Sequence, residues 1–154
     1  MRTIVLALAL AACAPKEPQV ISNTPASIAE ATFAESLDSD IAKFDTNAAG
    51  LYWRDLKEGD GPVVQAGQVV TVNYDGRFPD GRQFDASAPG DPIRFPIGVR
   101  RVIDGWDQGV VGMKVGGKRQ LIIPPALGYG PGGSPPVIPA NATLVFTVEV
   151  VGAQ

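Results

Sequence analysis

The run Gly98-Val-Arg-Arg-Val102-Ile103-Asp-Gly105-Trp106 decides the fold of this chain. It brings a tryptophan and two β-branched residues into one short turn, with a glycine between them. Alone, such a run would be ordinary core. Apolar and aromatic residues recur in short groups on either side of it: Tyr74, Phe84-Asp85, Leu127-Gly-Tyr129-Gly130, Val137-Ile138-Pro139 and Phe146. Together these groups can line a small aromatic pocket with few polar groups.

Composition limits the classes of function that remain. A length of 154 residues fits one domain with additional segments. The net charge of −3 gives no support for nucleic-acid binding. The chain has no histidine, which excludes histidine-dependent triads and the commonest zinc ligand, and its one cysteine excludes an internal disulfide. The high counts of glycine (18) and proline (14) favour a loop-rich fold built on strands.

The first residues resemble a bacterial lipoprotein signal. A basic start precedes an apolar run at residues 4–12, which is far shorter than the ~20 residues of a membrane-spanning helix and is typical of a secretory signal. Leu10-Ala-Ala-Cys13 resembles a lipobox, in which the cysteine is lipidated. Two alternatives are ordinary cleavage at Ala12-Cys-Ala14, which would leave the poorly accepted Pro15 after the cut, and a frayed terminus with a free thiol.

We therefore interpret residues 1–12 as a signal peptide and Cys13 as the lipidation site. This interpretation implies a protein anchored by lipid in the bacterial cell envelope and facing the periplasm, at the outer membrane if the host is Gram-negative. Residues 13–26 contain three prolines and few apolar side chains, which predicts a tether.

Residues 27–50 form an N-terminal extension with competing interpretations. Asn23-Thr-Pro25 can cap a short helix, and Thr32-x-x-Glu35 fits a capping box. Asp38-Ser-Asp40 argues against one continuous helix, and residues 41–44 fit an edge strand equally well. Four apolar residues nevertheless recur at helical spacing: Phe33, Leu37, Ile41 and Phe44.

The main domain, residues 51–154, reads as α+β: an antiparallel sheet packed against one short helix. The helix is expected at 103–111, with acidic residues near its positive N-terminal end. Pro79-Asp-Gly81 predicts a tight turn. β-Branched content, alternation and bounding turns predict the strands at 51–56, 68–74, 82–85, 93–96, 119–123 and 143–151.

Three motif matches are rejected. Gly112-x-x-x-x-Gly117-Lys118 lacks the Ser or Thr of a P-loop and leads into a strand. Gly128-x-Gly130-x-x-Gly133 is followed by two prolines, which forbid the helix that dinucleotide binding requires. Asn141-Ala-Thr143 is a glycosylation acceptor only in a eukaryotic secretory route, against which the lipobox argues.

From about residue 59 to 151 the sequence resembles the FKBP-type peptidyl-prolyl isomerases, the macrolide-binding immunophilins. The matching motifs occur in order along about 90 residues, which makes the match specific. They are Gly59-Asp-Gly61-Pro62, Val72-Asn-Tyr74-Asp-Gly76, Asp80-Gly81-x-x-Phe84-Asp85, Val102-Ile103-x-Gly105-Trp106, Gly109-Val110, Met113-x-Val115-Gly116, Leu127-Gly-Tyr129-Gly130 and Ile138-Pro139-x-Asn-Ala-Thr-Leu-Val-Phe146.

The resemblance implies a role for each pocket residue. Asp85 would face the twisting amide, positioned by the Tyr74 hydroxyl, while the N–H of Ile103 and the hydroxyl of Tyr129 would bind substrate carbonyls. Trp106 would form the floor under the prolyl ring. The remaining residues would bind substrate through aromatic or aliphatic surface: Phe84, Ile93, Val102, Ile138 and Phe146. Taken singly, each is more often plain core, and only the joint pattern favours a site.

The resemblance further implies X-Pro isomerisation of proline-containing polypeptides in the envelope, inhibition by macrolides, and neither cofactor nor metal. Two other hypotheses are a binding or chaperone module with little catalysis and a structural anchor with a vestigial pocket. The retention of Asp85 and Tyr129 favours the enzyme.

The sequence departs from the family pattern at four places. Ile93 stands where many members have an aromatic wall residue, and the segment 86–91 is shortened and lacks a basic residue. Ser134 stands where some members have a histidine at the pocket rim, and Gly128 replaces an alanine. These departures bear on macrolide affinity and substrate preference more than on activity.

Overall fold

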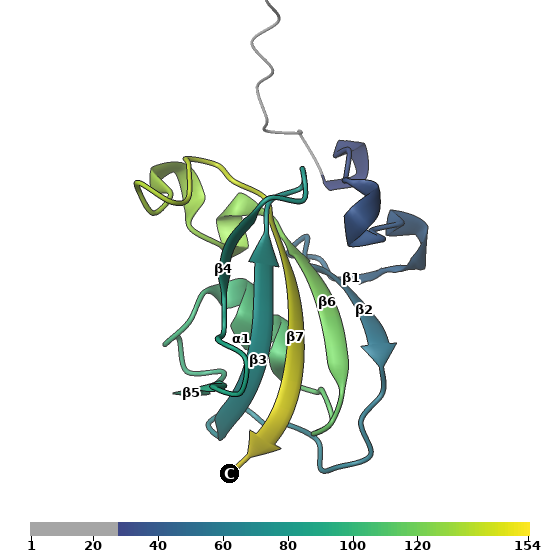
Figure 1. Cartoon of the computed structure of the whole chain (residues 1–154), viewed down its shortest axis with the longest axis vertical. Helices are drawn as coiled ribbons and strands as arrows, with labels where there is room; N and C mark the ends of the chain where they lie inside the picture. Colours follow the sequence, from purple (N-terminus) through teal and green to yellow (C-terminus); the bar gives the residue numbers. More distant parts are fainter. Residues whose placement is uncertain (1–27) are drawn as a thin grey trace, which may run out of the picture.

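The computed structural model describes residues 28–154, which form an antiparallel sheet with one α-helix packed against it (Figure 1). The strand order is β1-β2-β6-β7-β3-β4, and β5 pairs with β3. The strands are β1 (Asp45–Thr46), β2 (Tyr52–Lys57), β3 (Val69–Arg77), β4 (Gln83–Ala86), β5 (Ile93–Pro96), β6 (Lys118–Ile123) and β7 (Leu144–Ala153). Every predicted strand is therefore present to within three residues at each end, and the predicted α+β class is confirmed.

The helix α1 (Asp104–Val110) lies against one face of the sheet and falls inside the predicted range 103–111. Two of its residues are glycines because the sheet is so close. A Cβ on Gly105 would lie 2.6 Å from the Ile123 side chain, and one on Gly109 would lie 2.6 Å from Leu121. This close packing buries Trp106 between the helix and the sheet. The Asp107 carboxylate holds the preceding loop, because it accepts from the N–H groups of Gly98 and Arg100 at 2.7 Å each.

The rejected motifs have other local structures, as expected. Gly117-Lys118 leads directly into β6. Gly128 is the C-cap of the short 3₁₀ helix η4 (Pro125–Leu127), whereas Gly130 begins η5 (Gly130–Gly132) and Gly133 is its C-cap. No α-helix follows them in the chain up to residue 154. No helix among residues 28–154 is both long and apolar enough to cross a membrane.

Of the interpretations left open for the extension, the helix over Phe33–Phe44 is absent from the structure. The segment instead forms three 3₁₀ turns, η1 (Ile28–Glu30), η2 (Glu35–Leu37) and η3 (Ile41–Lys43), followed by strand β1. Asp38 ends η2 in the left-handed conformation with φ 44°, and its neighbour Asp40 caps η3 by accepting from the N–H of Ala42 at 3.2 Å. The capping box is also wrong, because the N-cap of η2 is Ala34. The edge strand exists, but β1 lies just beyond the predicted range 41–44.

The apolar residues of the extension cover the sheet face opposite α1. Along β6, Leu121 and Ile123 pack with the main core, whereas the intervening Ile122 packs with Ile28 and Leu37. Period-two alternation explains the separation, because successive side chains of a strand point to opposite faces. The extension therefore supplies a second, smaller core and leaves the α1 face to the candidate site.

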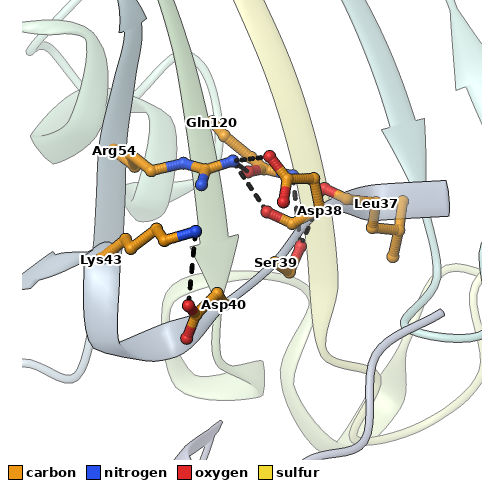
Figure 2. Close-up of polar contacts among 7 residues, drawn as sticks. All are labelled: Leu37, Asp38, Ser39, Asp40, Lys43, Arg54 and Gln120. Atoms are coloured by element: carbon orange, nitrogen blue, oxygen red, sulfur yellow. Dashed lines mark hydrogen bonds and ion pairs between the residues drawn. The ribbon is translucent and has the colours of Figure 1, made fainter. Parts of the chain in front are cut away.

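Polar contacts fasten this segment to the sheet (Figure 2). Gln120, which is only 3% exposed, donates from Nε2 to the Leu37 carbonyl at 2.7 Å and to Ser39 Oγ at 3.2 Å. Arg54 Nη2 donates to the Asp38 carbonyl at 2.7 Å and to its carboxylate at 3.1 Å. The turn between β3 and β4 is held as well, since the Ala34 N–H donates to the Pro79 carbonyl at 2.8 Å. The predicted signal, Cys13, the tether and the Asn23 cap lie outside the described residues.

Candidate active site

A cavity of about 450 Å³ opens between α1, the β3–β4 pair and the loops that flank β6 and β7. All ten residues predicted to line the site lie around it, although they come from segments far apart in the sequence. The lining comprises Tyr74, Phe84, Asp85, Ile93, Arg101, Val102, Ile103, Trp106, Tyr129, Ser134, Val137, Ile138 and Phe146.

Trp106 forms the floor of this cavity and is held by other rings. It is 5% exposed, with Tyr74 and Phe146 packed edge-on at centroid distances of 5.3 and 5.2 Å. Phe95 of β5 supports it at 5.3 Å. Edge-to-face packing is the preferred geometry of aromatic pairs, so the indole plane is fixed before any ligand binds. The indole Nε1 is buried and has no hydrogen-bond partner among residues 28–154.

The aromatic wall depends on a glycine. Strand register places Gly76 of β3 opposite Phe146 of β7 and next to β4. A Cβ at Gly76 would lie 2.7 Å from the Phe146 ring and 2.8 Å from the Phe84 ring. Without that Cβ the two rings meet edge-on at 5.5 Å, and Phe78 backs Phe84 at 4.9 Å. The result is a continuous apolar wall.

A hydrogen-bonded polar pair lies in the wall of the cavity. Tyr74 Oη donates to Asp85 Oδ2 at 2.7 Å, across the paired strands β3 and β4. Burial raises the pKa of Tyr74 well above its usual range, and the hydrogen bond to Asp85 and its negative charge raise it further. The phenol therefore stays protonated and acts as a donor. Asp85 Oδ1 accepts from the N–H of Ala86 at 2.9 Å, so both carboxylate oxygens are held.

Two free donors lie at the cavity. The Ile103 carbonyl accepts from the N–H of Trp106 at 2.9 Å, whereas the N–H of Ile103 makes no hydrogen bond within the described part of the chain. Tyr129 is 42% exposed, and its hydroxyl bonds no residue of 28–154. Ile138 is fixed beside them, because its N–H and carbonyl both pair with the backbone of Ser134. The cavity thus offers donors to a bound backbone while its base stays apolar.

Arg101 and Phe95 were not predicted to belong to the site. Arg101 lies within the run that contains Val102 and Ile103, and this adjacency was the available signal for its place in the lining. Phe95 lies two residues after the lining residue Ile93 on β5, so both side chains share one face of the strand, and its ring packs against Trp106. Among residues 28–154 there is no cluster of three or more Cys, His, Asp or Glu side chains that could hold a metal ion.

Comparisons with known proteins agree with this geometry. Residues 61–151 match the family described as FKBP-type peptidyl-prolyl cis-trans isomerase. The FK506-binding protein of Streptomyces anulatus is 52% identical over 106 residues, covering 67% of this chain and 86% of that protein. The crystal structure of FkpA from Escherichia coli superposes with a TM-score of 0.68 at 37% identity, covering 78% of this chain and 56% of that one.

Some relatives are much longer than this chain. The 46 kDa FK506-binding nuclear protein of Spodoptera frugiperda is 52% identical over 104 residues, which cover 67% of this chain but only 25% of that protein. The likeness therefore concerns one domain shared by proteins of different size. Because the family match includes more than half of the sequence and carries the strands and helix that build the cavity, the chain belongs to the FKBP-type peptidyl-prolyl cis-trans isomerase family.

Proposed function

We propose that this protein accelerates cis–trans rotation of X-Pro bonds in polypeptides, with the prolyl ring bound over Trp106. The observation that carries the proposal is the Tyr74–Asp85 hydrogen bond in the wall of a cavity whose base is aromatic. Such a site has the size and lining to hold a small apolar ring. It also provides a polar group that can face the amide of the bound substrate. It contains no histidine and no nucleophile positioned by a base, so hydrolytic chemistry has no support.

Isomerisation of an X-Pro bond requires a site that binds the twisted amide more tightly than the planar one, and it requires no strong acid or base. Amide resonance gives X-Pro rotation a barrier of ~18–20 kcal/mol, and the planar amide is more polar than the twisted one. The apolar surfaces of Trp106, Phe84 and Phe146 favour the less polar twisted state. In this proposal the Ile103 N–H and the Tyr129 hydroxyl, which both belong to residues that line the cavity, bind the flanking carbonyls and so lower the free energy of the twisted amide relative to the planar one.

An isomerisation assay on short X-Pro peptides tests the proposal. The protein without residues 1–22 should accelerate cis-to-trans conversion of Leu-Pro and Phe-Pro peptides more than that of polar X-Pro peptides. The apolar rim formed by Ile93, Val102 and Ile138 is the reason for this preference. A rate equal to the uncatalysed one, from protein whose circular dichroism shows it to be folded, would overturn the assignment.

We further propose that the protein acts in the bacterial envelope, held by lipid at Cys13. The support is the sequence pattern of residues 1–13, a short apolar run that ends at a cysteine after two alanines. Clients would then be envelope or secreted polypeptides with exposed prolines. Macrolide binding, for which the Streptomyces relative is named, is proposed at the same cavity, with Ile93 setting the affinity.

A further inference from the structure

A second hollow, of about 480 Å³, adjoins the candidate active site and shares three residues with it: Phe84, Val137 and Ile138. It lies between the β3–β4 turn and the loop that precedes β7, two segments found at the same end of the sheet (Figure 1). Its lining is Phe78, Arg82, Gln83, Phe84, Pro135, Pro136, Val137, Ile138 and Pro139. Because the two hollows share a wall, a polypeptide in one can continue into the other.

The two sides of this hollow differ in chemistry. The loop side carries three prolines and Val137, whose side chain is 53% exposed. The turn side carries Arg82, whose guanidinium stacks 4.8 Å from the centroid of the Phe78 ring. Arg82 is exposed and belongs to none of the ion pairs formed among residues 28–154, while its neighbour Asp80 accepts only from the Arg82 N–H. The guanidinium therefore lies on the Phe78 ring and forms no ion pair with a carboxylate of residues 28–154.

The distances limit where a ligand charge would have to lie. The Phe78 and Phe84 rings are 4.9 Å apart, and Arg82 lies on the Phe78 ring. The guanidinium is therefore within about 10 Å of the Phe84 ring. An extended chain covers about 3.3 Å per residue, so at most about three residues bridge the gap. A client whose proline lies over Trp106 and against the Phe84 ring thus reaches Arg82 within about three residues of that ring.

We propose that this hollow is a subsite for the client chain and that Arg82 selects an acidic side chain about three residues from the proline. The proposal rests on the proposed isomerase function and adds a sequence preference to it. Apolar contact with Val137 and the prolines aligns the chain, and the ordered guanidinium attracts the carboxylate. A planar cation is suited to this, because it can stack on Phe78 and bind a carboxylate in its plane at once.

The test uses the protein with four peptides that differ in one side chain. Two carry Glu three residues before or three residues after a Leu-Pro bond, and two carry Gln at the same places. Exchange spectroscopy by NMR measures kcat/KM without a coupling protease, whose own specificity would interfere. Variants are Arg82→Glu and, as a matched charge reversal on an exposed part of β2 away from both hollows, Lys57→Glu.

We expect one of the Glu peptides to exceed its Gln counterpart by about threefold, the size typical of an exposed charge pair. Arg82→Glu should invert this ratio and 1 M salt should abolish it, whereas Lys57→Glu should retain it. Equal rates for Glu and Gln peptides with wild-type protein, or the same loss in Lys57→Glu, would overturn the subsite while leaving isomerisation itself intact. No catalysis of any peptide by folded protein would overturn the proposed function and the subsite with it.

Discussion

Tyr74 and Asp85 are joined by a hydrogen bond of 2.7 Å that runs from the phenol to the carboxylate across strands β3 and β4. The second carboxylate oxygen accepts from the N–H of Ala86. Asp85 is exposed to solvent on strand β4, yet its side chain is held at both oxygens. The carboxylate is therefore preorganised at the cavity without being buried, which spares it the desolvation cost of an interior charge.

Asp85→Ala and Tyr129→Phe should each lower kcat/KM for a Leu-Pro peptide by about tenfold, the effect of losing one well-placed polar contact in the transition state. Both side chains lie at the cavity and not in the core, so the thermal midpoint should hardly change. Asp91→Ala, which removes an exposed acid from the neighbouring loop, serves as the control. Full activity of Asp85→Ala would show that the assigned role is wrong.

The raised pKa of Tyr74 predicts a specific loss of stability in alkali. A free tyrosine titrates near pH ~10, and the folded protein holds this proton more tightly than the unfolded chain does. The contribution of Tyr74 to stability is therefore complete below about pH 10 and is lost as the pH rises toward the folded-state pKa. Urea midpoints measured on either side of pH ~10 should fall more steeply for wild type than for Tyr74→Phe.

Asp85→Asn tests the cause of that shift. It removes the negative charge that raises the Tyr74 pKa, although the burial that contributes most remains. Tyrosinate absorbance should then develop at lower pH than in wild type. If the two titration curves superimpose, the carboxylate does not control the phenol.

Trp106→Ala should damage the fold as well as the site. Truncating a buried aromatic residue costs about 3–5 kcal/mol in the free energy of unfolding, and three rings pack on this indole. Trp53→Ala is the matched control, because Trp53 is only partly buried at the margin of the same core and should cost less. Urea denaturation measures both. An equal cost for the two variants would contradict the placement of Trp106 as the central floor residue.

Gln120→Ala should loosen the N-terminal extension without affecting catalysis. Gln120 is buried, and its amide is the donor that holds the Leu37 carbonyl, so its removal leaves polar groups unpaired at a cost of about 1–3 kcal/mol. Hydrogen exchange should accelerate in residues 35–46, while isomerisation of short peptides stays unchanged because the amide faces away from the cavity. Ser39→Ala, which removes the longer contact of the two, should have a smaller effect. Loss of activity in Gln120→Ala would instead tie the extension to the site.

The fold of the domain at residues 51–154 could be predicted from the sequence because the local signals and the long-range packing signals agree there. Alternation in β3 and β7, turn residues at Pro79-Asp-Gly81 and the glycines of α1 all indicate the same packing. Ile103, Trp106 and Tyr74 could be placed around one cavity because motif order fixed their elements. Their individual roles stay predictions until the variants above are measured.

The helical spacing in the extension did not identify its structure, for a physical reason. Leu37, Ile41 and Phe44 have helical spacing, but they are buried by the outer face of the sheet and not by one side of a helix. Short 3₁₀ turns joined by a left-handed Asp38 can present the same residues to that face. The spacing of apolar residues shows which side chains need burial, but it does not specify the surface against which they pack. Arg101 was missed similarly, because nothing in the sequence distinguishes a rim charge from a solvated one.

The last prediction concerns Cys13, which lies outside the described residues. A lipidated bacterial cysteine carries several acyl chains, and two or more chains suffice for stable anchoring at ~0.8 kcal/mol per buried CH₂. The protein should therefore fractionate with membranes and incorporate a fatty-acid analogue in metabolic labelling. Cys13→Ser should abolish the label and leave the protein uncleaved or mislocalised, with isomerase activity of the folded domain unchanged. A wild-type band without label would favour ordinary secretion. Residues 13–26 would then not tether the domain to a membrane.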